Sequence, residues 1–441
     1  MKPLFSRLAL FRSICFTAVF LSANALHLGA AETQNAVAET PNTAETPDVS
    51  GATRETVATP SATPNAKSPD PAPTATPNAT PSPIEDSAWA QAWRRECLSR
   101  AKAAEKKYQI AVAARDGWYF FAPELRHVGV GKFWGDAAAK TSRATSPENA
   151  DPLPAILDFK AQLDRLGIEL LLVPVPPKAV IYPEVLMPQN ALAALTDTSS
   201  TRSDISPRLD TFHQQFYASL RQNGVNVLDL TSPFLRHRFD AAGALYCRQD
   251  THWSGRACVM AAREIANVVK DRAWLAKARE KSKPNWSTFW MRRTIEGDLW
   301  PGKIAGAPPA ESLPLRFVGT ATSSTRSVGG KSQKVTLLKT LATQTSSPIL
   351  VLGDSHALVF SVGDDMHTRG AGLPDQLAFE LGLPVDLLAV RGSGATPSRS
   401  ELRRRVRANA NYLKSKKLII WCFSAREWTE TLGWQKVPLS P

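Results

Sequence analysis

Two short segments carry side chains of the types that nucleophilic catalysis uses. Ser355 follows the apolar run in ILVLGDSH, and Asp250 and His252 lie two positions apart in CRQDTHWSGRA. In an extended stretch, side chains at i and i+2 lie on the same side. The Asp250 carboxylate can then hold one imidazole nitrogen of His252 while the other nitrogen faces the Ser355 hydroxyl, as in a Ser-His-Asp triad. The residues alone leave other interpretations open: Ser355 as an ordinary helix N-cap, and Asp250 and His252 as surface-loop residues or metal ligands.

The immediate neighbours of these residues have separate expected roles. Asp354 and His356 flank Ser355, but adjacent side chains normally project away from each other, so neither is expected to serve the hydroxyl. Gly353 ends a predicted strand, and SHALVFSV is expected to begin a helix whose first N–H groups face an oxyanion. Trp253 is expected to form a wall of the site, and the residue after it to cap the following helix.

A dinuclear metallophosphoesterase is an alternative for an Asp-x-His segment followed by Gly-Asp. The segment GDDMH (363–367) offers further ligands for such a site. No Gly-Asn-His block follows, no apolar strand precedes DTHW, and the sequence has no CxxC or Cys/His cluster. We therefore expect neither a metal nor another cofactor.

The elements that must position these residues alternate between strands and helices. Apolar runs that predict strands buried on both faces occupy 168–175, 225–230, 348–353, 384–390 and 417–423. Helical patterns precede three of them, for example at Ile156, Phe159, Leu163 and Leu166. This alternation predicts a three-layer α/β/α fold with a mainly parallel sheet, in which the site lies at the carboxyl ends of the strands. Residues 283–347 break the rhythm and are expected to be an insertion.

The N-terminal part of the chain has a different composition. Residues 1–31 combine a basic start, an apolar core and a small-residue exit, which predicts a signal peptide cleaved after Ala25 or Ala31; an uncleaved membrane anchor is the alternative. Residues 32–88, rich in Thr, Pro and Ala, predict a disordered spacer. Residues 89–441 then form one folded domain outside the cytoplasm.

Charge and cysteine content constrain the partners and the redox state. The chain carries a net charge of +13, and residues 89–441 carry +16 once the +3 of 1–31 and the −6 of 32–88 are removed. A basic exported domain favours an anionic polysaccharide or a membrane surface over nucleic acid, although a dispersed basic surface explains the charge equally well. Four cysteines remain outside the leader, so one or two disulfides are expected, with the pairing open: Cys97, Cys247, Cys258 and Cys422.

Four motifs in a fixed order resemble one known family. LLVPVPPKAVIYPE, DTHWS, LGDSH and IIWCFSARE are similar to segments of the AlgJ/AlgX family of alginate O-acetyltransferases, which are exported SGNH-hydrolase-like proteins. The likeness extends from 115–126 to 421–428, and the Asp-x-His precedes the serine, as in that family. The resemblance implies Ser355 as nucleophile, His252 as base and Asp250 as the group that orients it. It also implies an exported polysaccharide as acceptor and a membrane O-acyltransferase as supplier of acetyl groups.

The chain departs from the family pattern in two respects. It ends soon after WCFSAREW, without room for the C-terminal carbohydrate-binding module of the AlgX type, and it lacks an identifiable asparagine for the oxyanion hole. Gly392 and Gly394 in RGSGA are the local candidates for backbone close to substrate, although a plain turn explains them as well. Lys178 in PVPPK is a candidate contact for an acidic sugar, or the prolines simply end a strand.

The residues leave three functions open. The first is acetyl transfer to a sugar hydroxyl through an acetyl-serine, and the second is a carbohydrate esterase that uses the same triad with water as acceptor. The third is a non-catalytic polysaccharide-binding or scaffold protein. The polymer and the acetyl donor are not specified by the sequence.

Overall fold

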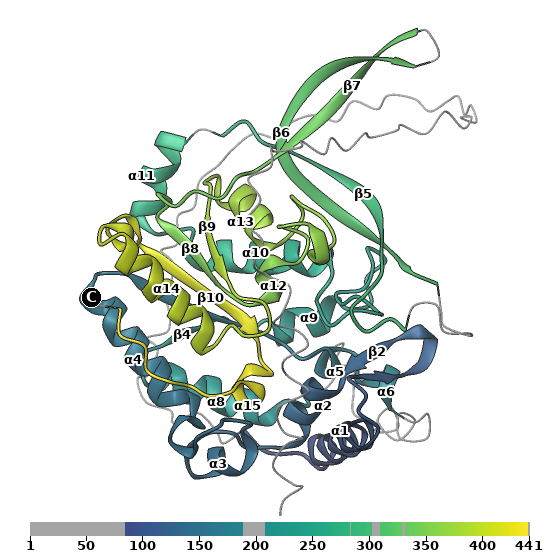
Figure 1. Ribbon diagram of the computed structural model, residues 1–441, viewed down its shortest axis with the longest axis vertical. Coiled ribbons are helices and arrows are strands. Elements are labelled where there is room, and N and C mark those ends of the chain that lie inside the picture. Colours follow the sequence, from purple (N-terminus) through teal and green to yellow (C-terminus); the bar gives the residue numbers. More distant parts are fainter. Residues whose placement is uncertain (1–83, 188–207, 283, 302–308, 329–330, 440–441) are drawn as a thin grey trace, which may run out of the picture. The chain divides into compact units, whose positions relative to one another are not determined.

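A parallel sheet of five strands, in the order β4-β3-β10-β8-β9, forms the centre of the protein (Figure 1). The computed structural model describes residues 84–187, 208–282, 284–301, 309–328 and 331–439. The strands of the sheet are β3 (Glu169–Val175), β4 (Asn226–Val227), β8 (Ile349–Gly353), β9 (Asp386–Ala389) and β10 (Leu418–Ser424). The predicted signal peptide and all but the last residues of the predicted spacer lie outside the described residues.

The central strands bury both of their faces. In β10, Cys422 packs into one apolar cluster and Trp421 into the other. The side chains of β3 and β8 alternate between the same two clusters. Because helices cover both sides, the interior positions of these strands are apolar, which explains the continuous runs in the sequence.

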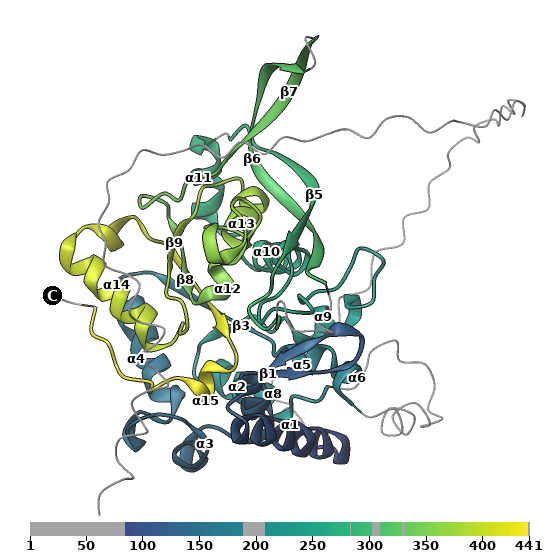
Figure 2. The ribbon, with the colours of Figure 1, turned by 45° about the vertical axis from the view of Figure 1, so that its right-hand side comes forward.

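Helices cover the two faces of the sheet and complete a three-layer α/β/α body (Figures 1 and 2). One face carries α10 (Gly255–Val269) and α13 (Leu373–Leu381). The other carries α4 (Pro152–Arg165), α8 (Thr211–Gln222) and α14 (Thr396–Ala408). The predicted fold class, α/β with a mainly parallel sheet, is confirmed.

The helix predicted before the first strand is α4, with one residue misplaced. Ile156, Phe159 and Leu163 are buried as expected. Leu166 is the C-cap and is 53% exposed, so it is wrong as a member of the core face. Gly167 follows with a φ of +67°, a left-handed conformation that ends the helix and turns the chain into β3.

The described residues of the predicted insertion, 283–347, contain a three-stranded antiparallel sheet, β5-β6-β7, and no further α/β unit. Its β6 packs on α10 and α13, and β6 and β7 extend away from the central sheet (Figures 1 and 2). On β6, Arg316 donates to Gln376 of α13 at 2.7 Å and pairs with Glu380 at 2.6 Å. The strands are β5 (Ser287–Ile295), β6 (Glu311–Val328) and β7 (Lys331–Thr340).

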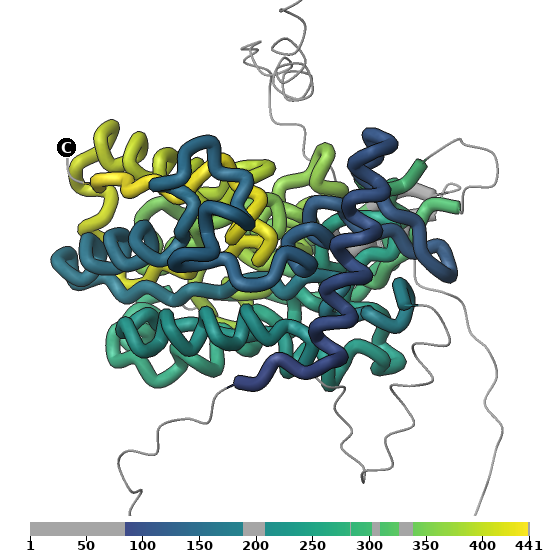
Figure 3. Tube along the Cα trace, turned by 90° about the horizontal axis from the view of Figure 1, so that it is seen from below, coloured from purple at the N-terminus to yellow at the C-terminus, as the bar shows by residue number. Residues whose placement is uncertain are grey.

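The N-terminal part of the described body packs on α5 (Lys178–Ile181), the short helix that follows β3. Helix α1 packs on α2, and Figure 3 views the chain from the side where α1 (purple) is nearest. This part comprises α1 (Ala88–Lys106), β1 (Ala111–Ala113), β2 (Tyr119–Phe121), α2 (Ala122–Gly129) and α3 (Ala138–Thr141). The remaining short helices are α5 (Lys178–Ile181), α6 (Pro183–Leu186), α9 (Thr231–His237), α11 (Ala273–Ser282), α12 (Ser355–Leu358) and α15 (Glu427–Glu430). Within the described ranges, none of the helices has the length and apolar character needed to cross a bilayer.

The expected disulfides do not form among the described residues. Cys97, Cys247, Cys258 and Cys422 are all free and buried. Cys97 lies on α1, Cys258 on α10 and Cys422 on β10, so each thiol fills a small space in the apolar core. Burial raises the pKa of all four thiols, which keeps them in the unreactive protonated form.

Trp421, at the centre of β10, provides a test of the layered core. It is fully buried, donates from Nε1 to the carbonyl of Gly394 at 2.7 Å and packs edge-on against Phe159. We expect Trp421→Ala to lower the free energy of unfolding by about 3–5 kcal/mol in chemical denaturation. Trp290→Ala is the matched control, since Trp290 is 54% exposed on β5, and it should change stability by less than about 0.5 kcal/mol. Equal effects of the two substitutions would contradict the assignment of β10 to the core.

Candidate active site

Asp250 and His252 form a buried, hydrogen-bonded pair. Nδ1 of His252 lies 2.6 Å from Oδ1 of Asp250, and the same oxygen accepts the backbone N–H of His252 at 2.9 Å. The segment is not extended as predicted, because Tyr246 and Trp253 pair across a tight loop. The two side chains still meet, since the carboxylate folds back onto the backbone of His252.

The second oxygen of Asp250 is held by two groups that the sequence analysis did not assign to the triad. Oδ2 accepts Nε2–H of His367 and the backbone N–H of Asp298, each at 3.0 Å. Asp298 also accepts the backbone N–H of Thr251 at 2.6 Å and its hydroxyl at 2.9 Å. A side chain at Gly297 would place Cβ 1.9 Å from the carbonyl oxygen of Gln249, so only glycine lets these two loops approach.

Neither His367 nor Asp298 has a spacing relation to the triad that the sequence reveals. The sequence suggests His367 only as a metal ligand in GDDMH, and Asp298 lies in the predicted insertion. His367 is one of seven histidines, and Asp298 is marked only by the Gly-Asp pair that it forms with Gly297. Both features are too common to single out a site residue. Their roles depend on contacts between segments far apart in the chain.

The charges in this network favour an ionised Asp250 and a basic His252. Burial alone would lower the pKa of His252, but the Asp250 carboxylate and its hydrogen bond outweigh it and raise the pKa. For Asp250, burial is likewise outweighed by its interactions with His252 and His367, and the pKa is well below its usual range. The pair therefore has the electrostatics of a general base with its orienting carboxylate.

Ser355 lies at the sharp turn after β8, as predicted, but it is not the helix cap. Asp354 is the N-cap of α12, and its Oδ1 accepts the backbone N–H of His356 at 2.8 Å. Its Oδ2 accepts the backbone N–H of Ser424 at the end of β10, also at 2.8 Å. Asp354 thus fixes the turn to the neighbouring strand, and Ser355 has no capping bond to make.

The helix that follows Ser355 is shorter than expected. It ends at Leu358, since Phe360 adopts a φ of +60°. The N–H groups of His356 and Ala357 bond to the side chain and carbonyl of Asp354. The expectation that these helix-start groups face an oxyanion is therefore wrong for those two donors.

The segment of His252 packs directly on the segment of Ser355. Nε1 of Trp253 donates to the backbone carbonyl of His356 at 3.0 Å, and the rings of His252 and His356 have centroids 4.9 Å apart. Trp253 is fully buried, so it joins the two segments rather than lining an open site. Nε2 of His252 is buried, and among the described residues no group bonds to it. The Ser355 hydroxyl is therefore not hydrogen-bonded to this nitrogen in the structure, although the nitrogen is the one that a triad requires to be free for the hydroxyl.

His356 has a different environment from His252. Its Nδ1 lies 3.3 Å from Oδ1 of Asp354, and the ring is buried against Trp253. Burial lowers the pKa of His356 to about 4, so this histidine is neutral near pH 7. Burial acts to raise the pKa of Asp354, but His356 and other partners lower it to about 2.

Lys178 occupies a structural position and not the predicted contact with an acidic sugar. Its ammonium group is buried and donates to the carbonyl oxygens of Tyr119, Arg248 and Asp250 at 2.6, 3.0 and 3.1 Å. These three acceptors use all three of its N–H groups. Lys178 therefore fixes the loop that carries Asp250.

Of the three predicted glycines, Gly353 and Gly394 lie at the turn of Ser355. At Gly353, a Cβ would lie 1.9 Å from the carbonyl oxygen of Cys422, so glycine is needed for β8 to pack against β10. At Gly394, a Cβ would lie 3.1 Å from the backbone nitrogen of Asp354, which brings the RGSGA loop against the turn. Gly392 has a φ of +84°, a conformation that favours glycine.

A metal ion would find three ligand atoms close together here. One atom each from Asp250, His252 and Asp298 lies within 4.8 Å of the others. Both oxygens of Asp250 and one of Asp298 already accept N–H or O–H groups of the protein. The hydrogen-bond network accounts for the cluster without an ion.

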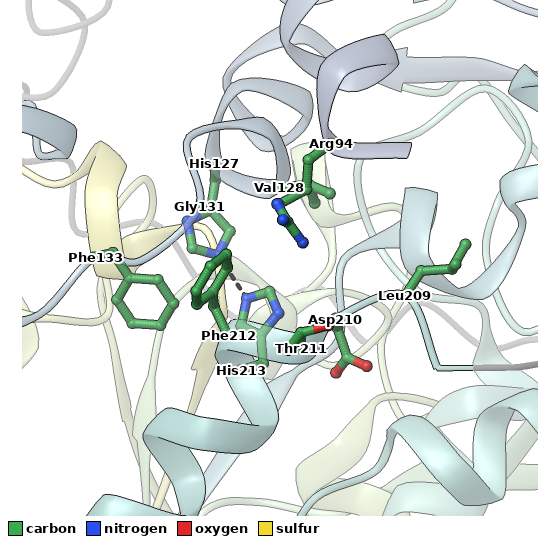
Figure 4. A pocket seen from close by; sticks show the side chains of 10 residues that line it. All are labelled: Arg94, His127, Val128, Gly131, Phe133, Leu209, Asp210, Thr211, Phe212 and His213. Carbon is green, nitrogen blue, oxygen red and sulfur yellow. Dashed lines mark hydrogen bonds between the residues drawn. The ribbon is translucent and has the colours of Figure 1, made fainter. Parts of the chain in front are cut away.

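A separate small pocket, shown in Figure 4, contains none of the predicted site residues. Its main feature is a contact of 2.7 Å between Nε2 of His127 on α2 and Nε2 of His213 on α8. His127 also bonds to the hydroxyl of Thr429 on α15 at 2.9 Å. Burial lowers the pKa of both histidines, so the neutral pair joins three helices as a structural link.

The chain is similar to known proteins over most of this body. The family described as SGNH hydrolase-like domain, acetyltransferase AlgX, matches residues 111–425. A probable alginate O-acetylase AlgJ of Pseudomonas aeruginosa is 26% identical over 189 residues, which cover 43% of this chain and 39% of the relative. The corresponding protein of Azotobacter vinelandii is 22% identical over 184 residues, covering 41% and 40%. The matched region thus spans about two fifths of the length of these relatives, 39% and 40%.

The alignment with a solved structure covers a larger part of the chain. The O-acetyltransferase domain of Pseudomonas putida AlgJ is 21% identical, with a TM-score of 0.48, and the alignment covers 73% of this chain and 92% of that one. The family match at 111–425 includes both the Asp250–His252 segment and the Ser355 turn. The chain therefore belongs to the family of SGNH hydrolase-like acetyltransferase domains represented by AlgX.

Proposed function

We propose that this protein is a polysaccharide O-acetyltransferase in which Ser355 carries the acetyl group, His252 is the general base and Asp250 orients His252. The observation that carries the proposal is the buried Nε2 of His252, which has no partner among the residues that the structure describes and whose opposite nitrogen is fixed 2.6 Å from Asp250. The contact of Trp253 with the carbonyl of His356 supports it, because this bond holds the two catalytic segments together.

The reaction has two steps that use the same base. First, Nε2 of His252 takes the hydroxyl proton while Oγ of Ser355 attacks the acetyl carbonyl, and the proton then passes to the leaving group. Next, a sugar hydroxyl gives its proton to Nε2 and attacks the acetyl-serine. The new sugar ester leaves as Ser355 recovers its proton. The raised pKa of His252 favours the imidazolium that forms in both steps.

The same proposal includes the setting in which the reaction occurs. Residues 1–31 act as a signal peptide or anchor and 32–88 as a spacer, so that the catalytic domain works in the periplasm or outside the cell. The acceptor is an exported anionic polysaccharide, which the net charge of +16 on residues 89–441 would attract. A membrane O-acyltransferase supplies the acetyl groups, and nucleic acid is not a partner.

Ser355→Ala tests the nucleophile. With an activated acetyl ester as donor, we expect turnover to fall at least about 10³-fold, since the substitution removes the atom that forms the acetyl-enzyme. Ser99→Ala, at an exposed position of α1, is the matched control and should retain full activity. Turnover is measured as release of the leaving group, and acetylated product is measured with oligosaccharide acceptors.

The outcomes of this experiment separate the three functions. Acetylation of an acceptor that depends on Ser355 supports the transferase. Release of free acetate that no acceptor diverts would favour an esterase. Unchanged turnover in Ser355→Ala would contradict both enzymes and leave a binding or scaffold role.

The pH dependence of turnover tests the base. His252 must be neutral to accept a proton, so kcat/KM should fall as the pH drops through its pKa, which is raised above the ordinary 6.5. In Asp250→Asn, the attraction that raises this pKa is lost while burial remains, so residual activity should be small and its acid limb should lie at lower pH. Asp136→Asn, an exposed acid, is the control. An acid limb that stays in place in Asp250→Asn would show that His252 is not the titrating base.

A further inference from the structure

We propose that His367 is a positioning residue for the Asp250–His252 pair, because it holds the carboxylate of Asp250 in the orientation that aims His252. The inference rests on the proposed function, since the orientation of His252 matters only if this residue acts as the base. It adds a fourth side chain to the site, from a loop that the triad itself does not include.

The two oxygens of Asp250 have separate tasks. Oδ1 binds His252 through Nδ1 and the backbone N–H. Oδ2 has only two donors among the described residues, Nε2–H of His367 and the backbone N–H of Asp298. Because a carboxylate rotates about one bond, the donors on Oδ2 decide where Oδ1 lies and therefore how the His252 ring is turned. Without His367, a single backbone donor would hold that side.

The backbone at His367 is held in a conformation that costs free energy. Its φ and ψ are +72° and −55°, and the N–H of Thr368 bonds to the carbonyl of Met366 at 3.0 Å across it. These are the features of the classic γ-turn, which is rare and strained for a residue with a side chain. Such conformations persist where the surrounding structure enforces them, often at functional sites. The contact with Asp250 gives this strained turn a function.

The loop that carries His367 is fixed at both ends. Val362 and Arg369 pair as an antiparallel bridge, and the N–H of Gly363 bonds to the carbonyl of Thr368 at 3.0 Å. The ring of Phe360 packs against that of His367 with centroids 5.6 Å apart. Since this loop directly follows α12, it connects the Ser355 turn to the carboxylate that orients its base.

Several charged or titratable groups surround His252 and affect its pKa. Asp250 and Asp298 raise its pKa, and Arg426 at the end of β10 lowers it, while the ring of His356 packs against it. His367 is linked to it through the hydrogen bond to Asp250. If the His367 donor is removed, more negative charge on Asp250 is left to face His252, so the pKa of His252 should rise.

Two substitutions at His367 separate positioning from folding. His367→Gly removes the imidazole and also relieves the positive-φ strain, so the fold should be retained. His367→Gln keeps an N–H donor near the position of Nε2 and has the same backbone cost as histidine. His237→Gln is the matched control, because His237 is half-exposed on α9 and pairs with exposed Asp240.

The experiment first treats wild-type protein with an activated acetyl ester and identifies the acetylated residue by peptide mass spectrometry. Steady-state rates, pH profiles and melting temperatures of the three variants are then compared with wild type. For His367→Gly we expect a roughly ten- to hundredfold loss of kcat, the size of a lost hydrogen bond to a charged group, with KM nearly unchanged. Its acid limb should move to higher pH and its melting temperature should not fall. His367→Gln should recover most of the rate.

Two results would overturn the inference. The first is a stable His367→Gly variant whose kcat and acid limb stay within about twofold of wild type. The second is an equal loss in His367→Gly and His367→Gln with the acid limb unmoved, since that pattern indicates packing alone. Failure of the wild type to acetylate Ser355 is a different result, seen before any variant is compared, and it would overturn the proposed function itself.

Discussion

The buried carboxylate of Asp250 is the group on which the site depends. It accepts four N–H donors: two from His252, one from His367 and one from the backbone of Asp298. A buried anion is costly unless it is paired and hydrogen-bonded, and these donors together offset the cost of burying this carboxylate. The hydrogen bonds join three loops that are distant in sequence. Lys178 adds a fourth connection, because its ammonium group binds the backbone carbonyl of Asp250.

In the chain, these loops lie both before and after the antiparallel sheet β5-β6-β7. Asp250 and His252 precede α10, and Ser355 follows β8, next to the central strand β10. Between them, β5 leads directly to Asp298, so the antiparallel sheet contributes a group to the site as well as covering α10 and α13. Asp354 then fastens the Ser355 turn to the end of β10. The order Asp-His before Ser follows from this arrangement of loops.

Local sequence patterns predict most of the layers and the two segments of the proposed site. The buried strands β3, β8 and β10 are visible because a sheet covered on both faces needs continuous apolar runs. The strand predicted at 225–230 is wrong in extent, because β4 includes only Asn226–Val227 and Asn226 is exposed. The Asp250–His252 pair is visible because its spacing is short. The positions of Leu166, His367, Asp298 and Lys178 are not, since each depends on which distant backbone lies opposite. A helix end, a strained turn and the three carbonyls that Lys178 binds are properties of the assembled fold, and single-residue composition carries no signal for them. The free cysteines belong to the same class, because pairing needs proximity that the sequence cannot display.

In the proposed site, Ser355 and His252 act as one unit, and Asp250 fixes the histidine. A double-mutant cycle on turnover of an activated acetyl ester measures this directly, with Ser355→Ala, His252→Ala and the double variant compared with wild type. Residues that act as a unit are strongly non-additive, so the account predicts that the double variant loses no more activity than either single variant. Losses that multiply in the double variant would contradict it, because they would show that the serine and the histidine contribute independently.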